Sequence, residues 1–212
     1  MKVDIWSDVR CPFCYIGKRK FELALEQFEH KAQVEIEWHS FELDPDAETK
    51  PQANSYDELA EKKGQTREWA VQMTDHVVKV AAGVGLNFNF EQAVVANSFN
   101  AHRLIQLAKF NGLDNEVEEA LFIAHFIDGQ NIDDFTVLIA IGTAAGLEKM
   151  AIEEMLNSFE FSNEVRADEQ IAQQIGISGV PFFVIDHKLA VSGAQPPETF
   201  LAAMEQAWHS KD

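Results

Sequence analysis

The sequence predicts an α/β fold in which a large all-helical domain interrupts a frame of strands and helices. Three observations carry this prediction. Polar and apolar residues alternate near the start of the chain, helical spacing continues from 56 to 174, and strand-like segments return between 180 and 191. A block of this length cannot be a loop in a compact domain. We therefore assign residues 1–44 plus 177–212 to one domain and residues 45–176 to a helical insertion.

The opening segment has the pattern of a strand, a helix and a second strand. Within residues 2–7, Val3 and Ile5 alternate with polar neighbours, which is the period of a strand. Apolar residues at helical spacing follow and end near His30. Residues 34–39 then alternate again, and the whole segment has about the length of one βαβ unit.

The insertion begins where Asp44-Pro45-Asp46 breaks this pattern. Beyond it, the spacing predicts helices over 56–63, 67–84, 97–110, 115–128, 133–145, 151–157 and 163–175. Residues able to cap a helix start are Thr66 and Asn163, and glycines able to end a helix are Gly112, Gly129, Gly146 and Gly176.

The end of the chain predicts a hairpin and a final helix. Residues 180–185 are apolar, a short polar turn occupies 186–188, and a second strand follows at 189–191. Pro196-Pro197-Glu198 then opens a helix that continues to about Trp208, with proline in its first turn.

Composition excludes several classes of function. The chain has 212 residues, of which 46% are hydrophobic, and its 17 basic and 35 acidic residues give a formal charge of −18. Nucleic acids and anionic membranes both attract concentrated positive charge, so neither is an expected partner. No segment approaches the roughly 18 apolar residues of a membrane span, and the N-terminus lacks a secretory pattern. We expect a cytoplasmic protein; the sequence does not indicate its oligomeric state.

Cys11 and Cys14 are the only cysteines of the chain, and their spacing allows several uses. A structural zinc site needs four ligands, this pair provides two, and the seven histidines form no closely spaced pair. We therefore expect no metal. A structural disulfide would close a very short loop in a reducing compartment, where it contributes little. Two buried, inert thiols remain an alternative.

Redox chemistry fits the local sequence better. If a helix begins at Pro12, Cys11 lies at its N-terminal end, where free N–H groups and the helix dipole favour a thiolate. Cys14, one turn further along, would be more buried. We therefore predict Cys11 as the catalytic nucleophile and Cys14 as the resolving thiol. Pro12 stiffens the turn, and Phe13 offers an apolar surface to a substrate or packs internally.

The motif residues resemble a known family. Residues 8–17 (DVRCPFCYIG) together with 179–183 (GVPFF) are similar to the DsbA-like thioredoxin superfamily. Residues 38–43, 97–103 and 192–196 resemble its cytoplasmic FrnE-like branch. The resemblance covers nearly the whole chain. It implies a thioredoxin fold interrupted by an all-helical domain and a thiol:disulfide oxidoreductase without a bound cofactor.

The resemblance also implies further site residues. Pro181 would be cis and face the cysteines, and Val180 would offer backbone groups to an extended substrate. His102, with Asn97 and Arg103, would line the cleft above Cys11 and contact substrate. The structural alternative is a helix start capped by Asn97, with His102 on a partly buried face.

Two residues of the second strand could also take part. Glu37 or His39 could assist proton transfer to Cys14, although a solvated strand face is the simpler interpretation.

The redox direction follows from the expected compartment. A DsbA-type couple near about −120 mV would be almost wholly reduced by the cytosolic glutathione pool, so we expect a reductase or isomerase. Its substrates would be protein or small-molecule thiols and disulfides, with glutathione as a co-substrate.

Two other functions stay open. Kappa-class glutathione transferases and 2-hydroxychromene-2-carboxylate isomerases have a similar architecture but usually carry serine in place of the first cysteine. A non-catalytic, chaperone-like binding protein is the third interpretation.

Overall fold

A computed structural model describes residues 1–210 and contains a sheet of four strands in the order β2-β1-β3-β4. The strands are β1 (Lys2–Ser7), β2 (Glu35–Ser40), β3 (Phe182–Ile185) and β4 (Leu189–Ser192). β2 runs parallel to β1, whereas β3 is antiparallel to both β1 and β4. All four strands lie within 1–44 and 177–212, where the sequence predicts them.

The helices are α1 (Pro12–Gln27), α2 (Ser55–Lys63), α3 (Arg67–Ala82), α4 (Phe99–Phe110), α5 (Asp114–Phe126), α6 (Phe135–Ala145), α7 (Lys149–Leu156), α8 (Ser162–Gln174) and α9 (Pro197–His209), with a short 3₁₀ turn η1 (Lys31–Gln33). An α/β fold interrupted by a long helical segment is therefore confirmed.

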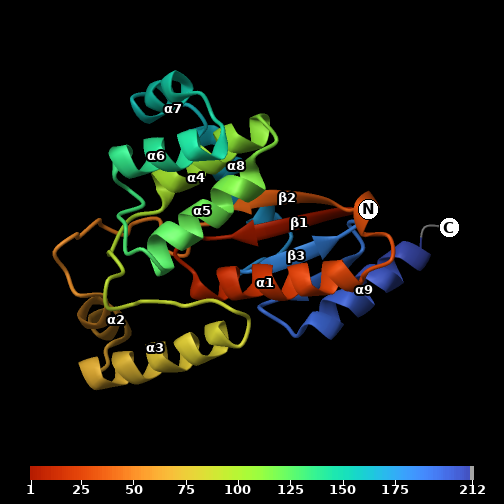
Figure 1. Cartoon of the computed structure of the whole chain (residues 1–212), viewed down its shortest axis with the longest axis horizontal. Coiled ribbons are helices and arrows are strands. Elements are labelled where there is room, and N and C mark those ends of the chain that lie inside the picture. Colours follow the sequence, from red (N-terminus) through yellow and green to blue (C-terminus); the bar gives the residue numbers. More distant parts are fainter. Residues whose placement is uncertain (211–212) are drawn as a thin grey trace.

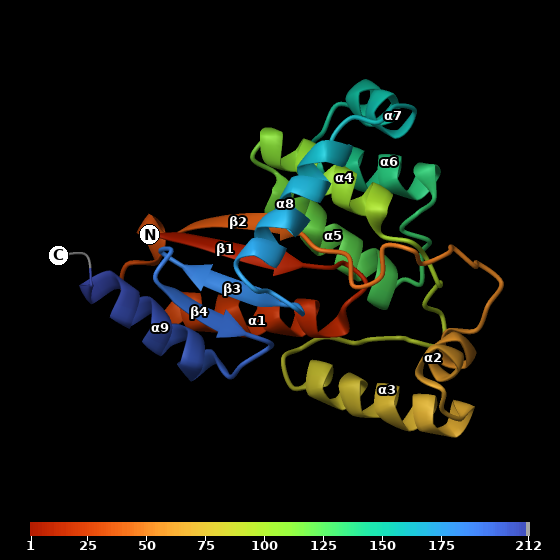
Figure 2. The same cartoon turned by 180° about the vertical axis from the view of Figure 1, so that it is seen from behind.

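Helices cover the sheet on both faces. Successive residues of β1 point to opposite sides, so Ile5 joins the core with α1 and α9, whereas Trp6 joins a smaller cluster with Ala172 of α8. Helices α4 to α8 gather on the β2 side (Figure 1). Seen from behind, α8 crosses the sheet, and α2 and α3 form a separate pair near the start of α1 (Figure 2).

The inserted helices and the strand frame share one buried core. Ile5 and Ile16 of the frame belong to the same cluster as Leu104 and Phe122 of the insertion. The rings of Tyr15 and Phe122 stack at 4.7 Å between centroids, which joins α1 directly to α5. The division into two domains stays a prediction, because packing is continuous across its boundary.

Two of the residues expected to mark helix ends do not do so. Asn163 lies inside α8, which begins one residue earlier after Phe161 with a φ of +61°. α5 ends at Phe126, before Gly129. A side chain at Gly129 would come within 2.6 Å of the Gln92 carbonyl oxygen, so this glycine permits a close backbone approach. Thr66, in contrast, caps α3 as expected by accepting a hydrogen bond from the Trp69 N–H at 3.2 Å.

Candidate active site

The two cysteines lie where β1 leads into α1. Cys11 is the N-cap residue of α1, and Pro12 occupies the first helical position, where its missing N–H leaves no hydrogen bond unmade. The Cys11 N–H donates to the Asp8 carbonyl at 2.9 Å, and the Cys14 N–H donates to the Cys11 carbonyl at 3.0 Å. Both thiols are free, and their exposed fractions are 5% for Cys11 and 1% for Cys14.

The segment before β3 forms the wall opposite the cysteines. The Val180–Pro181 peptide bond is cis, as the resemblance implies. The Cys11 Sγ donates to the Val180 carbonyl oxygen at 3.6 Å, so the thiol faces this segment directly. Gly17 of α1 allows Pro181 to lie this close to the helix, because a side chain at position 17 would come within 2.9 Å of the Pro181 Cγ.

Burial separates the roles of the two thiols. Removal from solvent, and then the neighbouring Cys11 thiol, raise the pKa of Cys14 well above its ordinary value. A thiol in this position stays protonated until something accepts its proton. Cys14 is therefore suited to act second, after Cys11 has reacted.

A polar cluster lies behind the cysteines and consists of Ser7, Asp8, His102 and Glu118. Each has an exposed fraction of 2% or less. The Ser7 hydroxyl donates to Glu118 Oε1 at 2.6 Å, and burial raises the pKa of Glu118 to about 7. Beneath the two cysteines, this cluster connects four parts of the chain: β1, α4, α5 and the loop that precedes α1.

Asp8 holds the loop that leads to Cys11. Its carboxylate accepts hydrogen bonds from the Arg10 N–H at 3.0 Å and the Leu43 N–H at 2.9 Å. Burial alone would raise the pKa of Asp8, but His102 and these N–H groups lower it below the ordinary value. The same carboxylate raises the pKa of His102 against the effect of burial.

His102 reaches this site from below. Its exposed fraction is 1%, and its Nε2 lies 3.6 Å from Asp8 Oδ1. The face of α4 that carries His102 was expected to be partly buried. It is fully buried, because the Asp8 loop covers it. A direct contact with substrate stays a prediction.

An apolar cavity of about 490 Å³ opens beside the reactive pair. Arg10 and Pro12 line one side of it, and Trp69, Met73 and Val77 of α3 line another. Phe13, by contrast, is 42% exposed next to Cys11. This cavity was not predicted from the sequence, although the three α3 residues recur every four positions and mark one face of the helix.

Comparisons with known proteins agree with this geometry. A model of the DSBA-like thioredoxin domain matches residues 2–205. The chain belongs to the DSBA-like thioredoxin domain family. A crystal structure of a probable DsbA oxidoreductase from Streptomyces coelicolor is 38% identical, has a TM-score of 0.94, and is matched over 100% of this chain and 92% of its own.

Two more distant structures share the DSBA-like fold. The cytosolic disulfide reductase DsbM from Pseudomonas aeruginosa, solved with GSH, is 16% identical, with a TM-score of 0.69 over 99% of this chain and 100% of its own. A 2-hydroxychromene-2-carboxylate isomerase is 14% identical, with a TM-score of 0.72 over 99% and 97%. The fold alone therefore does not separate reduction from isomerisation.

His39 of this DSBA-like chain does not lie on a solvated strand face, so that interpretation is wrong for this residue. Its Nε2 lies 2.9 Å from Asp4, its Nδ1 lies 2.8 Å from Asp168, and its ring stacks on Trp6 at 4.4 Å. These contacts raise the pKa of His39 although burial acts against it. They attach α8 to the sheet, and no interaction recorded in residues 1–210 joins His39 to Cys14.

Glu37 also has other partners. It forms ion pairs with Lys2 and Lys109. Glu37, Asp4 and His39 bring possible metal-ligand atoms within 4.8 Å of one another. The ammonium groups of Lys2 and Lys109 already neutralise these carboxylates, so we assign no metal to the cluster.

Asn97 and Arg103 of the DSBA-like domain have structural partners. The Asn97 side chain accepts from the Phe99 N–H at 2.7 Å at the start of α4. Arg103 donates to the carbonyl oxygen of Met155 in the last turn of α7 and to those of Ser158 and Glu160 just beyond it. The N-cap residue of α4 is Ser98, so Asn97 supports the turn before the helix and is not its cap, and Arg103 ties α4 to the end of α7.

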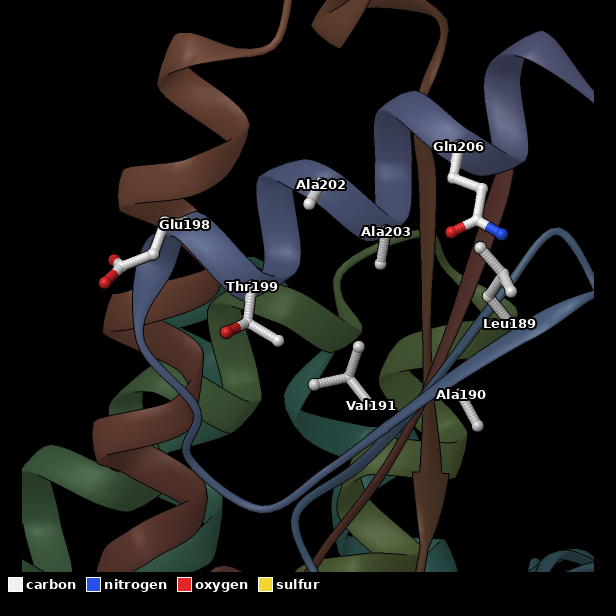
Figure 3. Close-up of a pocket in the computed structure, with 8 residues that line it drawn as sticks. All are labelled: Leu189, Ala190, Val191, Glu198, Thr199, Ala202, Ala203 and Gln206. Carbon is white, nitrogen blue, oxygen red and sulfur yellow. The ribbon is translucent and has the colours of Figure 1, made fainter.

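A second hollow, of about 480 Å³, lies between β4 and α9. Leu189 and Val191 enter it from the strand, and Thr199 and Ala203 enter it from the helix (Figure 3). Neither cysteine nor the Val180–Pro181 segment lines it, so it is separate from the candidate active site. Within residues 1–210, no helix is long and apolar enough to cross a lipid bilayer.

Proposed function

We propose that this chain is a thiol:disulfide oxidoreductase of the reductase or isomerase type, acting through Cys11 and Cys14. The observation that carries the proposal is a free, unequally buried pair at the start of α1, with the Cys11 Sγ 3.6 Å from the Val180 carbonyl. A structural pair would not need one thiol directed at a segment that can bind an extended substrate.

The proposed reaction has two steps. The Cys11 thiolate attacks a substrate disulfide, so a Cys11–substrate bond forms and the first substrate sulfur leaves as a thiolate. Cys14 then attacks the Cys11 sulfur. The Cys11–Cys14 disulfide forms, the second substrate sulfur leaves, and two electrons have passed to the substrate. An isomerase would release the mixed disulfide to another substrate thiol before this second attack.

The substrate is proposed to bind across two surfaces. An extended backbone would lie along Val180, and an apolar group beside the reacting sulfur would enter the cavity next to Pro12. Protein disulfides meet both requirements, and small-molecule disulfides with an apolar body meet the second.

The proposal includes glutathione as reductant and a cytoplasmic location. The glutathione pool is more reducing than a DsbA-type couple and would return the pair to its dithiol form. Support for glutathione as the reductant also comes from DsbM, whose structure was solved with GSH. No prosthetic group or metal is required, because the two sulfurs carry the electrons.

Insulin reduction coupled to glutathione tests the proposal. We expect turnover with the unchanged protein, loss of activity in Cys11→Ser, and a mixed disulfide trapped on Cys11 in Cys14→Ser, detected by mass spectrometry. Equal rates for the unchanged protein and Cys11→Ser would reject the proposal.

The same variants separate the alternative functions. Glutathione conjugation or isomerisation that survives in Cys14→Ser would favour the transferase or isomerase interpretation. Client binding that survives removal of both thiols, without turnover, would favour a binding protein.

A further inference from the structure

The second step of the proposed reaction poses a problem of proton transfer. Cys14 must lose a proton before it attacks Cys11, yet its exposed fraction is 1%. Burial and the Cys11 thiol both favour its protonated form. Bulk water does not reach this sulfur directly, so an acceptor inside the protein has to take the proton.

The contacts of Cys14 lead to such an acceptor. The Ser7 side chain, at the end of β1, acts on the Cys14 thiol and lowers its pKa against the effect of burial. The Ser7 hydroxyl also lies 2.6 Å from Glu118 Oε1 on α5. A hydroxyl can donate one hydrogen bond while accepting another. Ser7 can therefore accept from the Cys14 S–H while it donates to the Glu118 carboxylate.

We propose that Glu118, supplied by the helical insertion, accepts the proton of Cys14 through the hydroxyl of Ser7. This inference rests on the proposed function and assigns a proton path to its second step. Ser7 touches the reacting sulfur, whereas Glu118 acts through Ser7.

The step balances in protons and electrons. The Cys14 S–H proton moves to the Ser7 oxygen as the Ser7 hydroxyl proton moves to Glu118. The Cys14 sulfur keeps the electron pair and attacks Cys11. The Cys11–Cys14 bond forms, the bond from Cys11 to the substrate sulfur breaks, and the substrate leaves as a thiolate. Glu118 ends neutral, and Ser7 regains its hydroxyl in the reversed orientation.

The groups around Glu118 suit this exchange. Burial raises the pKa of Glu118 to about 7; His102 on α4 and Lys18 on α1 favour its charged form, while Asp8 disfavours it. A proton acceptor works best when its pKa lies near the working pH. The Ser7 hydrogen bond also favours the charged carboxylate that must accept the proton.

Neighbouring carboxylates are less suited to this role. Asp8 has a lowered pKa and is engaged by two backbone N–H groups. Glu119, next to Glu118 in sequence, forms ion pairs with Lys18 and Arg19, which together with Tyr15 lower its pKa. Glu118 is the acidic residue joined to the Ser7 hydroxyl.

The two steps can be measured separately with 5,5′-dithiobis(2-nitrobenzoate). In protein excess, Cys11 attack releases one coloured thiolate, and Cys14 attack then releases the second. We expect Glu118→Gln and Ser7→Ala to slow the second release at least about tenfold at pH 7.5, since a positioned acid or base contributes about 10²-fold or more. The first release should keep its rate.

Three comparisons make the test specific. Ser7→Thr retains a hydroxyl and should restore most of the second rate. Glu119→Gln removes the adjacent charge without touching Ser7 and should leave the ratio of the two rates unchanged. In the unchanged protein, the second rate should rise with pH up to about 7 and then level off. In Glu118→Gln it should keep rising with pH, because only the raised pKa of Cys14 then controls it.

Each negative result has a distinct meaning. If the unchanged protein never releases the second thiolate, the proposed function fails. If it does so with no break in rate near pH 7, or if Glu118→Gln releases both at unchanged rates, the proton path fails while the function stands. The pH profile of the unchanged protein needs no variant, so the test holds even if one variant does not fold.

Discussion

Glu118→Gln should increase stability at high pH, because the structure buries a carboxyl group that must be charged there. Glu118 has an exposed fraction of 1%, and its only hydrogen-bond partner recorded within residues 1–210 is the Ser7 hydroxyl. Glutamine has nearly the same shape, and its amide oxygen can accept the same hydrogen bond. The substitution therefore removes the charge and leaves the packing in place.

The magnitude follows from the pKa. Its ordinary value is 4.5, and burial raises it to about 7 in the folded protein. Between these values the folded state binds more protons than the unfolded state, so stability falls as pH rises through this window. At about 1.4 kcal/mol per pH unit, the loss reaches about 3 kcal/mol above pH 7. Below about pH 4.5 both states are protonated and the loss vanishes.

Urea denaturation at pH 5 and pH 8, followed by tryptophan fluorescence, measures this effect. We expect Glu118→Gln to raise the free energy of unfolding by up to about 3 kcal/mol at pH 8 and by under about 1 kcal/mol at pH 5, at an unchanged denaturant slope. Glu119→Gln is the matched control. The pKa of Glu119 is lowered by Arg19 and Tyr15, so loss of its charge should destabilise the protein at pH 8. Equal destabilisation by Glu118→Gln at both pH values would refute the reasoning.

Three further predictions concern the surroundings of the site. Asp168→Asn removes the charge of one of the two carboxylates hydrogen-bonded to the His39 ring and should destabilise the protein by about 3 kcal/mol at pH 7. The loss should be smaller in acid, where Asp168 itself becomes protonated, as urea titrations at several pH values would show. Gly17→Ala should slow the first thiolate release by roughly tenfold or more. The added carbon would lie 2.9 Å from Pro181 Cγ and displace the Val180–Pro181 segment that faces Cys11. An unchanged rate would contradict this prediction. Val77→Trp should fill the apolar cavity and raise KM for insulin without changing the rate of the first thiolate release. Equal KM values would show that the cavity does not bind substrate.

The predicted fold succeeded where the signal was local. Alternation in residues 2–7 and helical spacing in the insertion depend on neighbouring residues, and they located the strands and helices to within a few positions. Thr66 caps its helix through a bond only three residues long. The role of Gly129 could not be predicted in this way, because glycine is needed there for a close contact with Gln92, which is distant in the sequence.

The sequence located the cysteine pair but not the polar residues that lie behind it. Cys11 and Cys14 form a motif within four residues, and the position of Cys11 at a helix start follows from Pro12. Ser7 and Glu118 are 111 residues apart, and nothing in the sequence pairs them. The one available signal is an acidic residue on the apolar stripe of α5, four residues before Phe122.

The sequence by itself determined an α/β frame with inserted helices and a cysteine pair at the start of its first helix, because periodicity, caps and motif spacing are short-range properties. Only the tertiary structure decided which charged groups are buried and which residues they contact. Glu118 and Glu119 are adjacent and chemically identical, yet one lies under the cysteines and the other pairs with Arg19. Burial and pairing depend on which helices meet, so a pKa near 7 belongs to the fold and not to the residue type.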